Sequence, residues 1–240
     1  MTNSEVFGII KFFKDDEYLS QLCGGKLFCN TPEFYRLHNE IGISDRSEGC
    51  TWSFRQSRGD TGAKIVVGGH SIGTLANITF RSTGMKDGWL HCWTTLVMPQ
   101  DEAELEILVN DIKRIRSEFG LNYAYIPPAN INPFIEYIKT LTTHEVSAGN
   151  ITYSEKQREW SPICKSTSYQ YQREFRILIG ECQELSTEPL IIQNLKDFDD
   201  FIMKNISIEI SSIDGEWIWF GINGTRDIVH NKKRTEITVI

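Results

Sequence analysis

Segments with the composition of β-strands follow one another along most of this chain, and few helices separate them. In the first hundred residues, apolar and β-branched runs lie at 6–13, 26–30, 51–56, 64–67, 72–81 and 89–98. Further runs follow at 122–126, 145–154, 169–179, 206–210 and 217–222. Consecutive strands favour antiparallel pairing, whereas a doubly wound parallel sheet needs strands that alternate with helices. The sequence therefore predicts an α+β fold with a mixed, largely antiparallel sheet.

Helices are predicted in a few places only, and the clearest one covers residues 101–119. Its apolar side chains recur every three or four positions and so share one face: Leu105, Leu108, Ile112, Ile115 and Phe119. A brief helix is expected to follow the acidic residues 15–17 and to stop at the glycines 24 and 25, and other short helices are expected at 33–37, 133–140 and 195–204. The final TEITVI is a candidate for one more strand. Because neither a repeat nor a long linker divides the chain, residues 1–240 are expected to form a single domain flanked by these helices.

The charge and composition of the chain exclude several classes of protein. A net charge of −7 among 240 residues argues against broad electrostatic capture of nucleic acid or of an anionic membrane. No apolar run reaches about 18 residues, and the N-terminus lacks the features of a secretion signal. A cytoplasmic protein without a membrane partner is therefore expected. The six cysteines are dispersed without a CxxC pair, which favours buried, reduced thiols over a zinc site.

The common nucleotide-binding and hydrolase motifs are missing from the sequence. There is no GxxxxGK[ST] loop, and the glycines at 68, 69 and 73 do not have the spacing of a dinucleotide-binding fingerprint. Kinase, α/β-hydrolase and zinc-protease signatures are also missing. A candidate site must therefore come from less familiar clusters.

The first cluster lies in the segment 165–180, KSTSYQYQREFRILIG, in which residues 169–179 are interpreted as a strand. On a strand, Gln172, Glu174 and Arg176 would share one face. Glu174 is then either one member of a surface ladder paired with an arginine or a carboxylate that lines a cleft. The two interpretations are equally compatible with the sequence.

Two further clusters lie near the N-terminus. The loop 42–49 holds Asp45, Arg46 and Glu48, which form either a solvated loop or a binding site for phosphate or ribose. The stretch 11–14 is Lys-Phe-Phe-Lys, and more aromatic residues follow it at Tyr18, Phe28, Phe34 and Tyr35. Aromatic residues of this kind belong to the core more often than to a ring-stacking surface.

Together these clusters resemble a known group of proteins. The order is a Lys-aromatic strand, a short helix ending in Gly, Leu-Phe-Cys-Asn at 27–30, Phe-Tyr-Arg at 34–36, Asp45-x-x-Glu48-Gly49 and a late Glu174-x-Arg176. This order resembles bacterial toxin and phage-defence ADP-ribosyltransferases, in particular the DarT-type DNA-modifying toxins and the RNA-modifying toxin of toxin–antitoxin–chaperone systems. The similarity covers about residues 5–50 and 160–180.

The resemblance implies a fold, a cofactor and a set of roles. It implies a split sheet that holds NAD as substrate, with Glu174 as the catalytic carboxylate and Gln172 in support. The residues that it implies for NAD contact are Lys11, Phe12, Asn30, Tyr35, Asp45 and Arg46. The implied reaction transfers ADP-ribose to RNA, DNA or a protein, and an antitoxin protein is a possible partner. Two alternatives stay open: a noncatalytic interaction module with surface tryptophans, and a metal-dependent nuclease that uses Asp45, Glu48 and Glu174.

Overall fold

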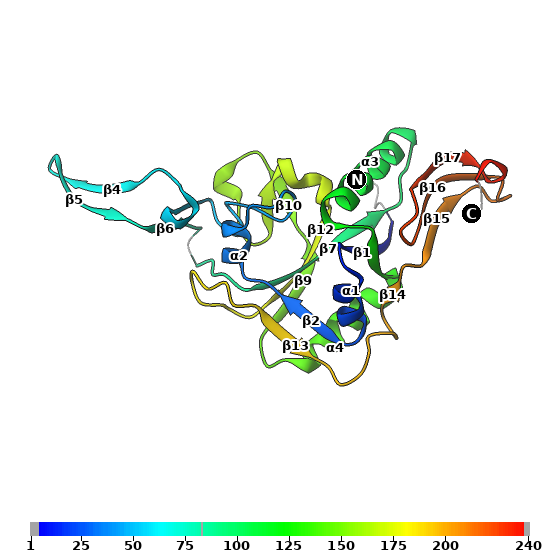
Figure 1. The fold of residues 1–240 in the computed structure, drawn as a ribbon, viewed down its shortest axis with the longest axis horizontal. Helices are drawn as coiled ribbons and strands as arrows, with labels where there is room; N and C mark the ends of the chain where they lie inside the picture. The colour runs from blue at the N-terminus through cyan, green and yellow to red at the C-terminus, as the bar shows by residue number, and fades with distance from the viewer. Residues whose placement is uncertain (1–4, 83, 238–240) are drawn as a thin grey trace.

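The computed structural model describes residues 5–82 and 84–237, and a six-stranded sheet lies at its centre (Figure 1). All five pairs of neighbouring strands in this sheet run antiparallel. In spatial order the strands are β14 (Met203–Lys204), β8 (Asn122–Ile126), β1 (Val6–Phe13), β7 (Trp89–Val97), β12 (Glu174–Ile179) and β9 (Val146–Asn150). The predicted α+β class with largely antiparallel sheets is confirmed. The one parallel pair in the described chain joins β10 (Thr152–Ser154) to β11 (Cys164–Ser166).

Strand β1 leaves its neighbour β7 near the middle of the sheet. The β1–β7 ladder ends at Ile10, whereas β1 stays paired with β8 to its last residue. A small sheet of β2 (Lys26–Cys29) and β13 (Leu190–Gln193) meets β7 through an isolated bridge at Asn30. The sheet is therefore split beside Lys11, the next residue of β1.

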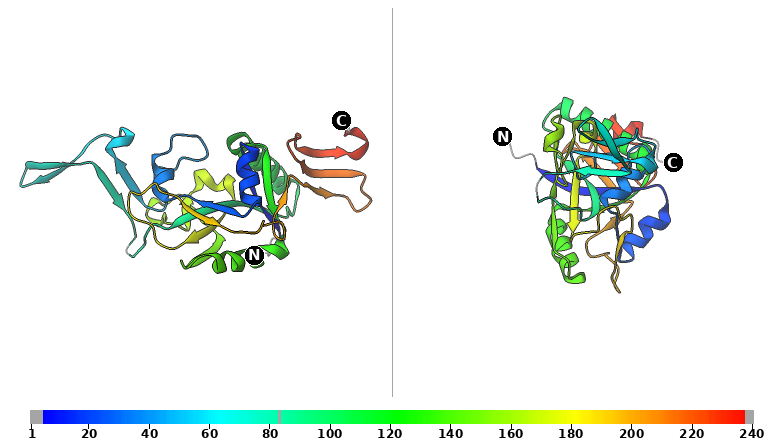
Figure 2. Two further views of the ribbon diagram at one scale, coloured as in Figure 1. Left: turned by 60° about the horizontal axis from the view of Figure 1, so that its bottom comes forward. Right: turned by 90° about the vertical axis from the view of Figure 1, so that its left-hand side faces the viewer.

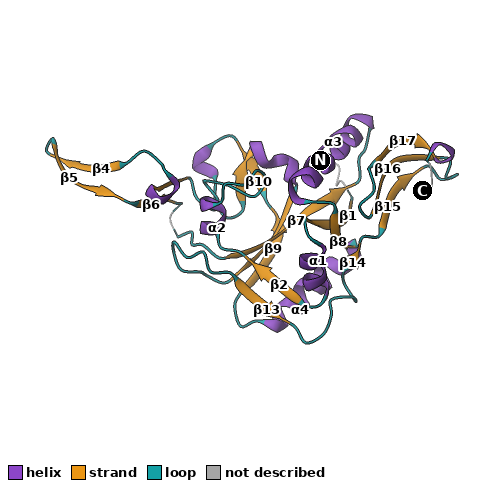
Figure 3. Ribbon diagram, viewed as in Figure 1, coloured by secondary structure: helices purple, strands orange, loops and turns teal. Residues whose placement is uncertain are grey.

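Helices cover both faces of the central sheet (Figure 3). On one face, α1 (Asp16–Cys23) and α4 (Pro128–Leu141) pack on a core that includes Ile9, Trp93, Phe134, Ile177 and Phe198. On the other face, α3 (Glu102–Phe119) packs on a second core that includes Ile10, Phe12, Leu108, Ile112, Tyr123 and Phe220. Because successive side chains of a strand point to opposite faces, Ile9 and Ile10 belong to different cores.

Local signals in the sequence set the ends of the helices. Asp15, Thr31 and Asp101 each cap a helix by accepting a backbone N–H, at the starts of α1, α2 (Pro32–Leu37) and α3. Helix α3 ends at Gly120, whose φ is +106° and where a Cβ would lie 2.3 Å from the backbone oxygen of Phe13. Only glycine fits here, where the end of α3 packs against the end of β1.

Two small sheets project from the body at opposite ends of the molecule (Figures 1 and 2). The strands β15 (Ser207–Ser211), β16 (Trp217–Asn223) and β17 (Val229–Lys233) form one of them. The other is an arm made of the hairpin β4 (Ala63–Val67) and β5 (His70–Leu75). At the base of the arm, β3 (Trp52–Arg55) pairs with β6 (Asn77–Phe80), and the short 3₁₀ turn η1 (Gln56–Arg58) follows β3.

Two predicted elements are wrong. Residues 169–179 are not one strand, because the 3₁₀ helix η3 (Thr167–Gln172) precedes β12 and Arg173, with a φ of +46°, turns the chain between them. Residues 195–204 do not form a helix, since Phe198 is buried beside α4 and the segment ends in β14 at the edge of the sheet. Burial of this aromatic anchor overrides the helical spacing of the local sequence.

Several other boundaries also moved. Helix α4 begins at Pro128, five residues earlier than predicted, and contains Pro133. The segment predicted as a strand at 145–154 is divided into β9 and β10. A strand was predicted for the final TEITVI, but its first residues belong to the 3₁₀ turn η4 (Arg234–Glu236). Residues 238–240 lie outside the described range. None of the helices in the described chain combines the length and the apolar run needed to cross a bilayer.

Candidate functional site

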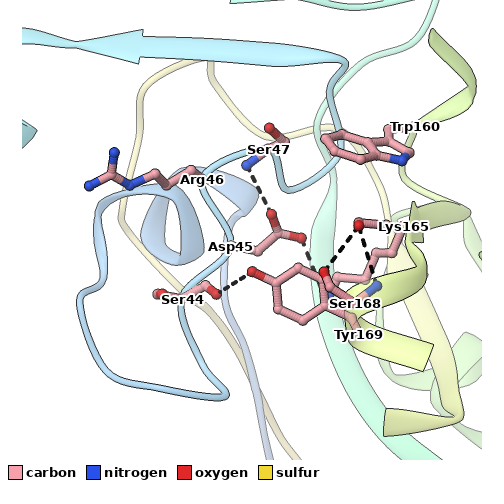
Figure 4. Close-up of a pocket in the computed structure, with 9 residues that line it drawn as sticks. Ser44, Asp45, Arg46, Ser47, Trp160, Lys165, Ser168 and Tyr169 are labelled. Atoms are coloured by element: carbon pink, nitrogen blue, oxygen red, sulfur yellow. Dashed lines mark hydrogen bonds and ion pairs between the residues drawn. The ribbon is translucent and has the colours of Figure 1, made fainter. Parts of the chain in front are cut away.

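An open pocket of about 400 Å³ lies between the loop 42–49 and the segment that leads into β12 (Figure 4). Serine hydroxyls, charged groups and two aromatic rings line it: Ser44, Asp45, Arg46, Ser47, Trp160, Lys165, Ser166, Ser168 and Tyr169. One wall therefore comes from the N-terminal part of the chain and the other from residues 160–169.

Side-chain hydrogen bonds fix the loop 42–49 to the opposite wall. The Tyr169 hydroxyl donates to the Ser44 carbonyl at 3.0 Å, and the Gln172 amide nitrogen donates to the Gly42 carbonyl at 2.9 Å. From its other side, Arg36 Nε donates to the Glu48 carbonyl at 2.8 Å. The loop is held at both of its ends, so the position of Asp45 between them is well defined.

A buried ionic cluster forms the floor of the pocket. Lys165 Nζ lies 3.0 Å from Glu174 Oε2 and 3.1 Å from Glu48 Oε2. Arg176 Nε lies 2.7 Å from Glu174 Oε1, and its Nη1 lies 2.8 Å from Glu48 Oε1. Each of the two cations thus bridges the same two carboxylates. Asp45 is the fifth member, with Oδ2 at 4.0 Å from Lys165 Nζ.

The charges of the cluster keep Glu174 ionised. Burial by itself would raise the pKa of Glu174, but the charges of Arg176 and Lys165, together with hydrogen bonds from Arg176 and Cys92, hold that pKa well below its ordinary value. Burial likewise acts to lower the pKa of Lys165, and the charges of Glu174 and Glu48 outweigh it, so this pKa lies well above its ordinary value. Glu174 is therefore a permanent negative charge beneath the pocket.

Asp45 has a different environment from the other two carboxylates. Burial and the charge of Glu48 raise the pKa of Asp45 to about 6, although Lys165 and the hydrogen bond from the Ser47 N–H act against this. The cluster holds three carboxylates and two cations, so one acidic group lacks a full counter-charge. Asp45 lies farther from a cation than the other two carboxylates, and its pKa is therefore the one that is raised.

A second ionic cluster supports the loop from behind. Arg36 Nη1 and Nη2 each lie 2.8 Å from an oxygen of Asp87, and Arg81 Nη2 lies 2.7 Å from the same carboxylate. Arg55 forms a similar two-point contact with Glu33 at 2.5 and 2.7 Å. This cluster joins α2, β3 and the segment before β7, and it does not reach the pocket.

The residues to which the resemblance assigns NAD contact or catalytic support lie in three different places. Asp45 and Arg46 line the pocket, and Figure 4 shows Asp45 directed towards Lys165 and Arg46 directed away from it. The Arg46 side chain is 69% exposed and pairs with Asp60. Gln172 lies beneath the pocket, where its amide oxygen is 3.4 Å from Lys165 Nζ.

The other implied residues lie deeper in the fold. Lys11 Nζ donates to the Cys92 carbonyl at 2.8 Å, and burial lowers the pKa of Lys11. Tyr35 forms a hydrogen bond with Asn30, while burial raises the pKa of Tyr35 well above its ordinary value. Phe12 is a core residue whose ring centre lies 5.6 Å from that of Tyr123. Lys11 and Glu174 both contact Cys92, and none of these three residues lines the pocket.

Lys165, Trp160 and Tyr169 line the pocket but are not among the site residues predicted from the sequence. A signal for Lys165 does exist, because it is the one charged residue between positions 161 and 172. A lone lysine in an uncharged stretch that precedes a mid-strand acid is a candidate for a buried counter-ion.

The pocket combines features suited to a polar ligand that contains a planar ring. Trp160 and Tyr169 offer ring surfaces, Arg46 offers a cation at the rim, and Asp45 offers a carboxylate that can exchange a proton.

Comparisons with known proteins add nothing to this description. The chain matches no protein-family model, no curated protein and no solved structure.

Proposed function

We propose that the chain is an ADP-ribosyltransferase that binds NAD in the pocket between the loop 42–49 and residues 160–169. One observation carries the proposal: the early loop with Asp45 and Arg46 lines a single pocket, and the late-chain Glu174 lies directly beneath it, joined to Asp45 through Lys165. The resemblance in motif order assigns NAD chemistry to those same segments.

The electrostatics of the cluster suit cleavage of the bond between nicotinamide and ribose. Positive charge builds up on the ribose as this bond breaks, and a nearby carboxylate stabilises it. Three carboxylates surround Lys165, and the low pKa of Glu174 keeps that residue charged throughout. The site therefore retains one more negative than positive charge when Asp45 is ionised.

The remaining pocket groups can be matched to the other parts of NAD. The rings of Trp160 and Tyr169 suit stacking against a planar heterocycle, and Arg46 with the serine hydroxyls suits the diphosphate. The volume of about 400 Å³ lies within the usual range for small-molecule sites, roughly 300–1,000 Å³. The acceptor is proposed to be RNA, DNA or a protein, and an antitoxin is the proposed protein partner.

The test is NAD turnover by the purified full chain. Release of nicotinamide is followed by chromatography, and labelled NAD reports transfer to acceptors in a cell lysate. The Glu174→Gln variant is expected to lose at least about 100-fold in rate, while the exposed Glu159→Gln is the matched control and keeps full activity. If the folded wild-type protein neither binds nor consumes NAD in either assay, the proposal is wrong.

A metal-dependent nuclease is a second candidate, because Asp45, Glu48 and Glu174 do converge. However, both oxygens of Glu48 and both of Glu174 face Lys165 or Arg176. Within residues 5–82 and 84–237, no group of three acidic, His or Cys side chains has a geometry that could hold a metal ion. Magnesium-dependent cleavage of RNA or DNA by the same samples would nevertheless favour this candidate over the transferase.

A further inference from the structure

The three carboxylates of the cluster occupy unequal positions relative to the pocket. Asp45 lines the pocket, whereas Glu48 and Glu174 do not. Both of those glutamates are held by the same two cations, at distances of 2.7–3.1 Å. Each of the four oxygens of these glutamates faces one of the two cations, and the side chains of Glu48 and Glu174 are only 2% and 4% exposed.

Asp45 has an oxygen available on the pocket side. Its Oδ1 accepts the Ser47 backbone N–H at 2.9 Å, which fixes the orientation of the carboxylate. Its Oδ2 lies 4.0 Å from Lys165 Nζ, beyond hydrogen-bonding distance, and no other described residue donates to it. A bound molecule in the pocket would therefore meet Oδ2 of Asp45 before any other carboxylate oxygen of the cluster.

We infer that Asp45 is the group that removes the proton from the attacking acceptor, while Glu174 stabilises charge without exchanging a proton. This inference rests on the proposed transferase function. It divides between Asp45 and Glu174 the catalytic role that the motif resemblance gives to Glu174 alone.

The proposed step is balanced in atoms and charge. The acceptor heteroatom forms a bond to C1′ of the ribose as the bond from C1′ to the nicotinamide nitrogen breaks. The electron pair of the broken bond returns to the nicotinamide ring, which leaves as a neutral molecule. The acceptor proton passes to Oδ2 of Asp45 and from there to solvent. When water is the acceptor, the same step hydrolyses NAD.

The surroundings of Asp45 are consistent with a group that changes its protonation near neutral pH. Glu48 faces it from the same loop, Lys165 from β11, Arg176 from β12 and Tyr169 from η3. Burial and Glu48 favour the neutral form more strongly than the two cations favour the charged form, which brings the pKa to about 6. Glu174 lacks this property because its pKa is held low by two close cations.

The experiment measures nicotinamide release from pH 4.5 to 8.5, together with NAD affinity by calorimetry, for the wild-type chain and Asp45→Asn. We expect the wild-type kcat to rise with pH through about 6 and then level off. Asp45→Asn should bind NAD within about threefold of wild type, lose about 100-fold or more in kcat, and lack the rise near pH 6. Asp111→Asn is the matched control, since Asp111 is a half-buried carboxylate that also has a raised pKa but lies outside the pocket. It should keep the wild-type profile.

A second variant separates a proton-transfer role from a structural one. Asp45→Ala removes the carboxylate, and added formate should restore part of its activity in proportion to the formate concentration. No rescue by formate, an Asp45→Asn kcat within threefold of wild type, or an effect confined to NAD affinity would each overturn the role of Asp45. These outcomes leave the proposed function intact. A wild-type chain that neither binds nor consumes NAD removes both proposals together.

Discussion

Lys165 is the residue whose replacement tests the buried ionic cluster most directly. Lys165→Met keeps a side chain of similar length and removes the ammonium that faces Glu174, Glu48 and Asp45. Arg176 alone would then face three buried carboxylates. Because removal of one partner leaves uncompensated buried charge, such changes cost about 3–5 kcal/mol.

The stability lost in Lys165→Met has an upper limit, because a buried carboxylate can take up a proton instead of staying charged. From an ordinary pKa of 4.5 for a glutamate, protonation at pH 7 costs about 3 kcal/mol per group, and at pH 5 less than about 1 kcal/mol. With Lys165 replaced, we expect burial to raise the native pKa of one of the three carboxylates above its unfolded value, so that the native state binds an extra proton and gains stability as pH falls. We therefore expect a loss of about 3 kcal/mol at pH 7 that shrinks to about 1 kcal/mol at pH 5.

Urea denaturation followed by tryptophan fluorescence at both pH values measures these differences. Lys156→Met is the matched control, because Lys156 is 65% exposed and its Nζ lies 3.5 Å from Glu159, so this change should cost less than about 0.5 kcal/mol. The reasoning is refuted if the two variants are equally stable at pH 7. It is also refuted if the gap between Lys165→Met and wild type fails to narrow at pH 5.

Three further predictions concern stability, each checked by urea or thermal denaturation. The pKa of Asp45 rises from 3.8 to about 6 on folding, so between pH 4 and 6 the native state keeps a proton that the unfolded chain releases. As pH rises from 4 to 6, the free energy of unfolding of the wild-type chain should fall by on the order of 3 kcal/mol, and that of Asp45→Asn should not. Asp87→Asn, which breaks the contacts to Arg36 and Arg81, should cost about 3–5 kcal/mol, and a loss below 1 kcal/mol would contradict the assigned role. Replacing residues 63–75 with a short Gly-Ser turn should change Tm by only a few degrees, because the arm is mostly exposed, whereas a loss of cooperative unfolding would show that the arm supports the body.

Much of the fold could be predicted because its elements carry strong local signals. The strand at 122–126 and the start of α3 after Asp101 agree with the structure, since an apolar run and an N-cap act over a few residues. The edge strands β13 and β17 were missed. Both are short and have no clear alternation of apolar and polar residues; in addition, β13 pairs with β2, which lies more than 150 positions earlier, whereas β17 pairs with the neighbouring β16.

The site was predicted in part, and the reasons differ from residue to residue. The loop with Asp45 and the segment with Glu174 stand out by composition, and the structure brings them together through Lys165. The shared strand face of Gln172 and Glu174 was wrong, because Arg173 adopts a left-handed conformation that non-glycine residues rarely take. Lys165 nevertheless contacts both Gln172 and Glu174, because the turn at Arg173 brings them to the same side, which the alternation of side chains along a strand does not predict.

The two walls of the pocket are made at very different times during synthesis. The hydrogen bond between Tyr169 and Ser44 joins residues 125 positions apart, and at 5–20 residues per second the ribosome needs roughly 6–25 s to cover that interval. Until β11 and β12 emerge, Asp45 and Glu48 have neither Lys165 nor Arg176 as a partner. A nascent or truncated chain that ends before β11 therefore has no assembled pocket. If the proposed activity harms the cell that makes it, this order of assembly delays that activity until most of the chain has been synthesised.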